Sequence, residues 1–140
     1  MPVLYDSAPN RRPLSFAVHV GPALLYIGAI FYGGLIRMRA LPEVGFVPTD
    51  KLLHAAAFAG LAFLLLRAAV FGMPRAAARR QLSFAALGAS AVGALLEICQ
   101  AFVPYRSADV LDWVADTVGA GLAIGVLTVW QRHLAKQAND

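Results

Sequence analysis

Four long apolar runs constrain the fold of this chain more than any other feature. Each run has about 20 to 23 residues, and at ~1.5 Å per residue a helix of that length crosses the ~30 Å hydrocarbon core of a bilayer. Inside a bilayer every backbone amide needs a partner within the protein, which favours helices. We therefore predict an all-α polytopic membrane protein, with four transmembrane helices bundled into a single domain over residues 1–140. The predicted helices are Leu14–Ile36, Leu52–Phe71, Leu82–Val103 and Val110–Trp130.

The composition agrees with a membrane protein. Hydrophobic residues make up 59% of the chain and charged residues only 14%, whereas an average soluble domain has ~25% charged residues. The net charge is +4, but the basic residues fall between the apolar runs rather than along one stripe. We therefore expect no nucleic-acid partner. A single cysteine excludes an internal disulfide and a cysteine-based zinc site.

The distribution of lysine and arginine predicts the orientation, because cytoplasmic loops carry more of these residues than outer loops. We predict that both termini are cytoplasmic and that the loops Arg37–Lys51 and Pro104–Asp109 face outward. Arg67 lies near enough to the cytoplasmic side to reach it. The predicted cytoplasmic side holds Arg11, Arg12, Arg75, Arg79, Arg80, Arg132 and Lys136, and the outer side holds Arg37, Arg39, Lys51 and Arg106.

Ionisable and polar residues gather at the outward ends of three predicted helices. Four of the eight acidic residues of the chain lie between Leu95 and Gly119. Within each helix, spacings of three, four or seven residues place these side chains on one face. The residues concerned are Asp50, Lys51 and His54 in the second helix, Glu97 and Gln100 in the third, Arg106 in the loop, and Asp109, Asp112 and Asp116 in the fourth.

These charges need a polar environment. A charged side chain at the bilayer centre costs ~2.5 to 3.5 kcal/mol on insertion scales, so such groups normally face the bundle interior or water. Counted from the predicted outer ends of their helices, Glu97 and Asp116 each lie ~9 Å deep. We predict a polar site open to the outside, with these two carboxyls at its floor and with Lys51, His54 and Arg106 as their partners.

The fourth predicted helix also contains a GxxxG motif, formed by Gly121 and Gly125. Such motifs allow helices to approach one another closely. We expect this motif to pack inside the bundle in preference to forming a dimer. The oligomeric state is left open.

The polar residues resemble the pattern of the VanZ-like family, which is named for a protein associated with resistance to teicoplanin. The family pattern has DKxxH at the start of one helix and ExxQ near the end of a later one. An Arg follows, then an Asp six residues on, an Asn four further and a Gly three beyond. The matching residues are Asp50, Lys51, His54, Glu97, Gln100, Arg106, Asp112, Asp116 and Gly119, with Asp116 where the family usually has Asn. The motif-bearing part covers about residues 50–125.

The resemblance implies a multi-pass protein of the bacterial inner membrane that acts in the cell envelope and contributes to glycopeptide tolerance. We expect it to bind a lipid-linked cell-wall intermediate or a lipoglycopeptide on the extracytoplasmic side, while the rest of its surface contacts the lipid bilayer. Arg106 and Lys51 suit a phosphate or carboxylate group, and the acidic residues suit amide or hydroxyl donors. The expected ligand-binding residues are Lys51, His54, Glu97, Gln100, Arg106, Asp112 and Asp116.

Three other interpretations of the same residues remain open. A membrane hydrolase or transferase could use His54 as a general base together with Glu97 and Asp112. A proton-coupled carrier or regulatory subunit could exchange protons at Glu97 and Asp116. The charged residues could also do no more than hold three helices together. We favour ligand binding over catalysis, and we expect no cofactor and, without an HxxxH or HExxH motif, no metal.

Overall fold

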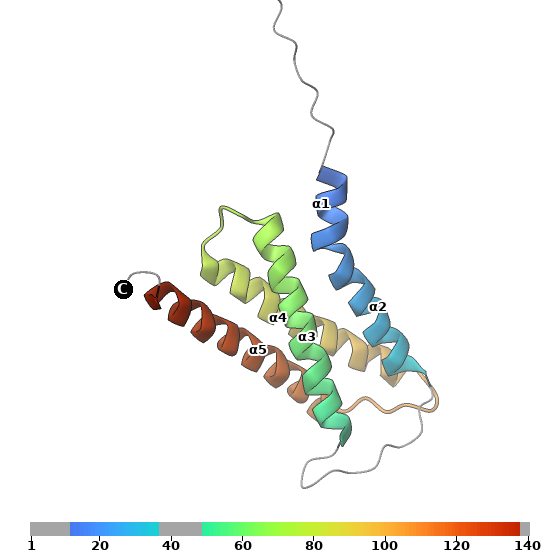
Figure 1. Ribbon diagram of the computed structural model, residues 1–140. Coiled ribbons are helices and arrows are strands. Elements are labelled where there is room, and N and C mark those ends of the chain that lie inside the picture. Colours follow the sequence, from blue (N-terminus) through green and yellow to red (C-terminus); the bar gives the residue numbers. More distant parts are fainter. Residues whose placement is uncertain (1–11, 37–48, 138–140) are drawn as a thin grey trace, which may run out of the picture.

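The computed structural model describes residues 12–36 and 49–137, and these residues contain helices but no strand (Figure 1). The predicted all-helical fold is therefore confirmed for this part of the chain. The predictions made for Arg11, Arg37 and Arg39 lie outside the described residues. The helices are α1 (Arg12–His19), α2 (Gly21–Leu35), α3 (Thr49–Gly72), α4 (Ala78–Ala101) and α5 (Val110–Gln137).

Three of the helices are long and apolar enough to cross a membrane. These are α3, α4 and the part of α5 from Val110 to Leu134, each with 24 or 25 residues. They correspond to the second, third and fourth predicted spans, with ends that differ by a few residues. Helix α2 has 15 residues, or about 22 Å at 1.5 Å per residue, which is shorter than the ~30 Å hydrocarbon core.

The first predicted span differs from the prediction because its helix is interrupted at Val20, between α1 and α2. Pro22 lies just inside α2 and has no backbone N–H, so it cannot donate to the carbonyl of Val18 as a helical residue would. Backbone hydrogen bonds still bridge the interruption, from Val20 N to Phe16 O at 2.8 Å and from Ala23 N to Val20 O at 3.1 Å. The two helices consequently follow one another with only a local break in the hydrogen-bond ladder.

Helix α3 lies at the centre of the arrangement, packed against α5, α4 and α2 (Figure 1). Apolar side chains fill the core between these helices, and they also cover much of the outer surface. Leu87 of α4, for example, is 70% exposed. An apolar surface of this kind suits contact with lipid and has no advantage in water. The buried core consists of Phe58, Leu61 and Ala62 of α3, Ala89 and Leu96 of α4, and Ala120 of α5.

Close packing between α3 and α5 depends on Gly119. A Cβ atom added at Gly119 would overlap the backbone of Ala55, so only glycine allows this approach. Gly121 and Gly125 are exposed instead, and a Cβ atom added at either would meet no other atom within 4 Å. The predicted packing of the GxxxG motif inside the bundle is therefore wrong, because the helix turns these two glycines away from α3 and α4.

The two ends of the bundle differ in their charged residues. The start of α3, the end of α4 and the start of α5 lie together at one end, where Lys51 contacts Asp109 (Figure 1). The opposite end holds the short α3–α4 connection and the end of α5. His19 stacks on Phe71 there, with ring centroids 4.6 Å apart, and so ties α1 to α3. The basic residues of this opposite end include Arg75, Arg79, Arg80, Arg132 and Lys136.

Candidate functional site

Three helices bring ionisable side chains together at the end of the bundle where α3 and α5 begin and α4 ends. We call this group the polar cluster. It contains five of the seven predicted ligand-binding residues, and Asp109 joins them from the position just before α5. Its members are Lys51 and His54 of α3, Glu97 of α4, and Asp109, Asp112 and Asp116.

Lys51 bridges two acidic residues near the start of α5. Its Nζ donates hydrogen bonds to Asp109 Oδ2 at 2.7 Å and to Asp112 Oδ1 at 2.5 Å. Asp50 lies farther away, with its Oδ2 3.8 Å from the same nitrogen. Because two close carboxylates share it, the Lys51 ammonium is already more than neutralised within the protein.

His54 lies one turn deeper in α3 and contacts the next acidic residues of α5. Its Nδ1 and Asp116 Oδ1 form a hydrogen bond of 2.9 Å, in which the imidazole N–H donates when the carboxyl is ionised. Its Nε2 lies 3.7 Å from Asp112 Oδ2. The ring is thus held between two carboxyl groups, an arrangement that fixes the orientation of the imidazole.

Glu97 joins α4 to the polar cluster. Its Oε2 accepts a hydrogen bond of 2.7 Å from the backbone N–H of Asp109, just before α5 begins. Its Oε1 is buried and has no hydrogen-bond partner, and the same is true of Asp116 Oδ2. Gly93, one turn before Glu97, makes room for the Asp116 carboxyl, because a Cβ atom there would lie 2.7 Å from Asp116 Oδ2.

Exposure decreases steadily along the acidic face of α5. The side chain of Asp109 is 42% exposed, that of Asp112 is 15% exposed and that of Asp116 is fully buried. Glu97 is also buried, with 7% of its surface exposed. Glu97 and Asp116, the two carboxyls predicted to lie deepest, are the least exposed of these acidic groups.

The carboxyl of Asp109 is the member of the polar cluster that lies outside the three long helices. Hydrogen bonding to the Lys51 ammonium, followed by a hydrogen bond from the backbone N–H of Leu111, holds its pKa below the ordinary value. Because the pKa of Asp109 is lower in the folded protein, its interactions stabilise the fold at pH values above the unfolded-state pKa of ~3.9. This stabilisation is lost as the pH falls through the pKa of Asp109 in the folded protein.

We therefore expect Lys51→Gln to raise the pKa of Asp109 towards its ordinary value, because the stronger of its two favourable contacts is lost. The shift is measurable by a pH titration of ¹³C-carboxyl-labelled aspartate by NMR in detergent micelles. Lys136→Gln, at the far end of α5, is the matched control and should leave the titration of Asp109 unchanged. An Asp109 pKa that is the same in Lys51→Gln and in the unmodified protein would contradict the contact.

Gln100 and Arg106 were predicted as ligand-binding residues, but both bind the end of α2 instead of the acidic residues. Gln100 Nε2 donates to Gly34 O at 3.0 Å, and Arg106 Nη2 donates to Ile36 O at 3.0 Å and to Gly33 O at 3.4 Å. The last carbonyls of a helix have no partner within it, so they attract such donors. The predicted pairing of Arg106 with the carboxyls is therefore wrong, and its Nε is buried without a hydrogen-bond partner.

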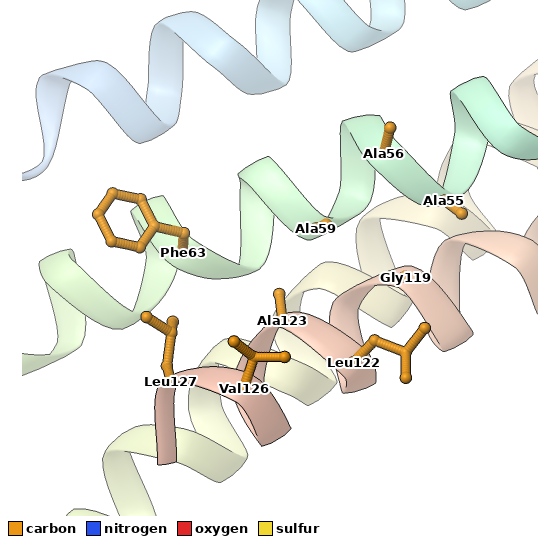
Figure 2. Close-up of a pocket in the computed structure, with 9 residues that line it drawn as sticks. All are labelled: Ala55, Ala56, Ala59, Phe63, Gly119, Leu122, Ala123, Val126 and Leu127. Carbon is orange, nitrogen blue, oxygen red and sulfur yellow. The ribbon is translucent and has the colours of Figure 1, made fainter. Parts of the chain in front are cut away.

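An apolar groove runs between α3 and α5 (Figure 2). Ala55, next to His54 in the sequence, and Gly119, one turn after Asp116, lie at one end of it. Phe63 and Leu127 lie at the other end (Figure 2). Its remaining lining residues are Ala56, Ala59, Leu122, Ala123 and Val126. The lining is small at the Ala55 end and bulkier at the Phe63 end, and this elongated apolar surface suits a hydrocarbon chain.

Helical spacing predicts most of the polar cluster, but two of its structural features were not predicted. The backbone N–H of Asp109 was not considered as a partner for Glu97, because the loop geometry before α5 has no signature in the sequence. Gly93 was not singled out either, although its position one turn before Glu97 is visible in the sequence. A glycine at that spacing from a buried acidic residue is a signal worth testing.

Comparison with known proteins identifies the family. The family model described as VanZ/LLP1 matches residues 15–131, which is most of the chain. No curated protein and no solved structure gives a significant match. The matched region includes every member of the polar cluster and all of α2, α3 and α4. With its three long apolar helices, which fit a membrane protein of this type, the chain belongs to the VanZ/LLP1 family.

Proposed function

We propose that the protein crosses the bacterial inner membrane four times, with both termini in the cytoplasm and the polar cluster on the extracytoplasmic side. Residues 12–35, which contain α1, Val20 and α2, together measure about 36 Å at 1.5 Å per residue, enough for a crossing. His19 contacts Phe71 near the end of α3, while Gly34 contacts Gln100 near the end of α4. This pair of contacts supports a first segment that runs alongside the other helices over most of their length.

The charge distribution supports the same orientation. Arg75, Arg79 and Arg80 lie in or beside the α3–α4 connection, and Arg132 and Lys136 lie near the end of α5. At the other end of the bundle the described basic residues are Lys51 and Arg106, and both are engaged by other groups of the protein. Loops rich in lysine and arginine remain on the cytoplasmic side.

The polar cluster binds a cell-surface or lipid-linked ligand in this proposal. The observation that carries it is that three apolar helices bring His54 together with the carboxyl groups of Glu97, Asp112 and Asp116, the last of which is fully buried. Interhelical polar contacts in membranes contribute only ~0.6 kcal/mol on average. Stability alone is therefore a weak reason to bury so many ionisable groups.

The chemistry of the polar cluster favours a ligand that donates hydrogen bonds. Lys51 is already paired with Asp109 and Asp112, so it is less suited to hold a phosphate than the sequence suggested. Carboxylate oxygens instead accept hydrogen bonds from hydroxyl, amide or ammonium groups. Such groups are plentiful in cell-wall intermediates and in lipoglycopeptides, whose acyl chain would lie in the groove between α3 and α5 (Figure 2).

Binding of such a ligand at the cell surface is the route by which the protein would contribute to teicoplanin-type tolerance. Gln100 and Arg106 serve a positioning role in this scheme, because they hold the end of α2 beside the polar cluster. His54, Asp112 and Glu97 would face the ligand. His54 and Asp112 are partly exposed, whereas Glu97 is buried beneath them.

The proposal is tested by a growth assay with teicoplanin on cells that express Asp112→Asn or Glu97→Gln, with membrane abundance measured in parallel. We expect tolerance to fall while abundance stays near that of the unmodified protein, because both substitutions keep the shape of the side chain. Ser83→Ala, at an exposed position on α4 away from the polar cluster, is the control. Unchanged tolerance in both variants, or tolerance that falls only in proportion to abundance, would contradict a ligand site.

A membrane hydrolase or transferase is the second candidate, and one observation favours it. His54 is oriented by Asp116 through a 2.9 Å hydrogen bond, as a general base is oriented by a carboxylate. Asp112 lies beside the other ring nitrogen, and Glu97 completes the set predicted for catalysis. His54→Gln distinguishes the candidates, because glutamine keeps hydrogen-bonding capacity but cannot exchange a proton near neutral pH. A binding protein should retain tolerance in this variant, whereas an enzyme should lose it.

A further inference from the structure

We propose that the polar cluster holds one divalent metal ion, bound by His54, Glu97 and Asp116. The three residues come from α3, α4 and α5, so the site would exist only when the bundle is assembled. One candidate ligand atom from each residue lies within 4.8 Å of the other two. This inference concerns the same cluster as the proposed function, but it does not require that an envelope ligand bind there.

The distances fit an ion after small side-chain movements. Three atoms no more than 4.8 Å apart lie within about 2.8 Å of a common centre, whereas zinc is bound at ~2.0 to 2.2 Å by histidine nitrogen and carboxylate oxygen. Each ligand atom would therefore move by less than ~1 Å, which rotation of a carboxyl or imidazole group provides.

Two buried oxygens without a hydrogen-bond partner support an ion at this position. Glu97 Oε1 and Asp116 Oδ2 are both buried without a hydrogen-bond partner, and their side chains are 7% and 0% exposed. Buried polar atoms in proteins are nearly always satisfied, and a bound ion is one of the few explanations for an exception. The two atoms belong to two of the three residues that form the proposed site.

The charge of the polar cluster supports a cation with two positive charges. Four carboxyl groups, those of Glu97, Asp109, Asp112 and Asp116, surround only two groups that can be positive, Lys51 and His54. With His54 neutral, as a metal ligand must be, the four carboxylates and Lys51 leave three negative charges between apolar helices. Uncompensated charge is costly in such surroundings. A divalent cation offsets two of these charges and would also give the two unpartnered oxygens a partner.

The donor set indicates which cations to test. Histidine nitrogen suits zinc and other first-row transition metals, and carboxylate oxygen suits manganese, magnesium and calcium. One nitrogen and two carboxyl groups together therefore favour Zn²⁺ or Mn²⁺. The sequence suggested no metal because the three residues are 43 and 19 positions apart, and no sequence motif connects ligands from three separate helices.

The experiment measures cation binding by the full-length protein in detergent micelles after treatment with EDTA. Titration with Mn²⁺ is followed by the electron paramagnetic resonance signal of the free ion, and titration with Zn²⁺ is followed by competition with a coloured chelator. We expect saturable binding of one ion per chain. Pulsed electron paramagnetic resonance should also detect a histidine nitrogen coupled to bound Mn²⁺, and this coupling should be absent in His54→Gln.

Two substitutions of the carboxyl ligands test the assignment. Glu97→Gln and Asp116→Asn should each weaken binding by ~10-fold or more, since loss of a direct ligand should cost at least as much as the ~10- to 100-fold loss seen on mutation of outer-shell partners. Asp50→Asn removes a nearby negative charge without removing a proposed ligand, and His133→Gln removes an exposed histidine at the far end of α5. Both controls should bind the ion like the unmodified protein.

Absence of saturable Zn²⁺ and Mn²⁺ binding by the unmodified protein would overturn the inference, whatever the variants do. Equal affinity of Glu97→Gln, Asp116→Asn and the unmodified protein would overturn it as well. If a carboxyl variant does not fold, the nitrogen coupling and its loss in His54→Gln decide the assignment. A negative result leaves the proposed function standing, because tolerance is measured without added cation and depends on a different ligand.

Discussion

Replacement of Gly119 by alanine is expected to prevent close packing of α3 and α5 and to reduce the amount of folded protein sharply. A Cβ atom at this position would overlap the backbone of Ala55. Backbone atoms cannot rotate away as a side chain does, so the two helices would have to separate. Overpacking of a core commonly costs ~1 to 3 kcal/mol of unfolding free energy, and Gly119→Val should cost more than Gly119→Ala.

Separation of these helices would also disturb the polar cluster, because His54 precedes Ala55 and Asp116 lies one turn before Gly119. Abundance in the membrane and thermal unfolding in detergent micelles would measure the effect. Gly121→Ala is the matched control on the same helix, since a Cβ atom there meets no other atom within 4 Å. Alanine also has a better helix propensity than glycine. A Gly119→Ala protein as stable as Gly121→Ala would show that α3 and α5 are farther apart than described.

Removal of the His54 side chain is the second substitution with a large expected effect. Asp116 is fully buried, and its Oδ1 has its hydrogen bond to His54 Nδ1. His54→Ala leaves this buried carboxyl without its hydrogen-bond partner, which typically costs ~1 to 3 kcal/mol, and more for a charged group. Asp116→Asn should cost much less, because asparagine has almost the same shape, carries no charge and can still form a hydrogen bond with the imidazole.

A double-mutant cycle distinguishes this pairing from independent effects. The combined variant His54→Ala with Asp116→Ala should be more stable than the sum of the two single losses predicts, because no unpaired carboxyl remains. Unfolding free energies measured in detergent micelles provide the comparison. His133→Ala is the matched histidine control, since this histidine is exposed and hydrogen-bonds the exposed Gln137 side chain. Additive losses at His54 and Asp116 would contradict a coupled pair.

The acidic face of α5 shows how far helical spacing alone predicts a site. Asp109, Asp112 and Asp116 follow one another at intervals of three and four residues, so any helix places them on one side. Their decreasing exposure follows directly from the distance of each residue from the helix end. The same rule applies to Lys51 and His54 of α3, which lie three residues apart and contact successive members of this face.

The first apolar run shows a limit of the hydropathy argument. Its length predicted a single helix, but Pro22 interrupts the hydrogen-bond ladder and divides the run into α1 and α2. The missing N–H of proline was visible in the sequence and could have located the interruption. Hydropathy averages over a whole run, so it does not register one residue that lacks a donor.

Arg106 and the glycines of α5 show what depends on the packing of helices. The charge of Arg106 suggested carboxyl partners, yet its guanidinium donates to the carbonyls at the end of α2, which the sequence represents only as ordinary backbone. Among the glycines, the motif residues Gly121 and Gly125 are exposed, whereas Gly119 makes the close approach. Small shifts in helix rotation decide which side of α5 meets α3.

The residues alone determine the helices and the alignment of their charges. A long apolar run in a bilayer must be helical, because its backbone amides need partners within the run. The period of 3.6 residues per turn then places the charged residues on one face of each helix. Those properties depend on neighbours within one turn of the chain. The partners of Glu97, Gln100 and Arg106 depend instead on contacts between segments 12 to 73 residues apart. Such contacts depend on how far each helix is rotated about its axis and shifted along it relative to its neighbours. The volumes of the side chains across the whole interface determine both.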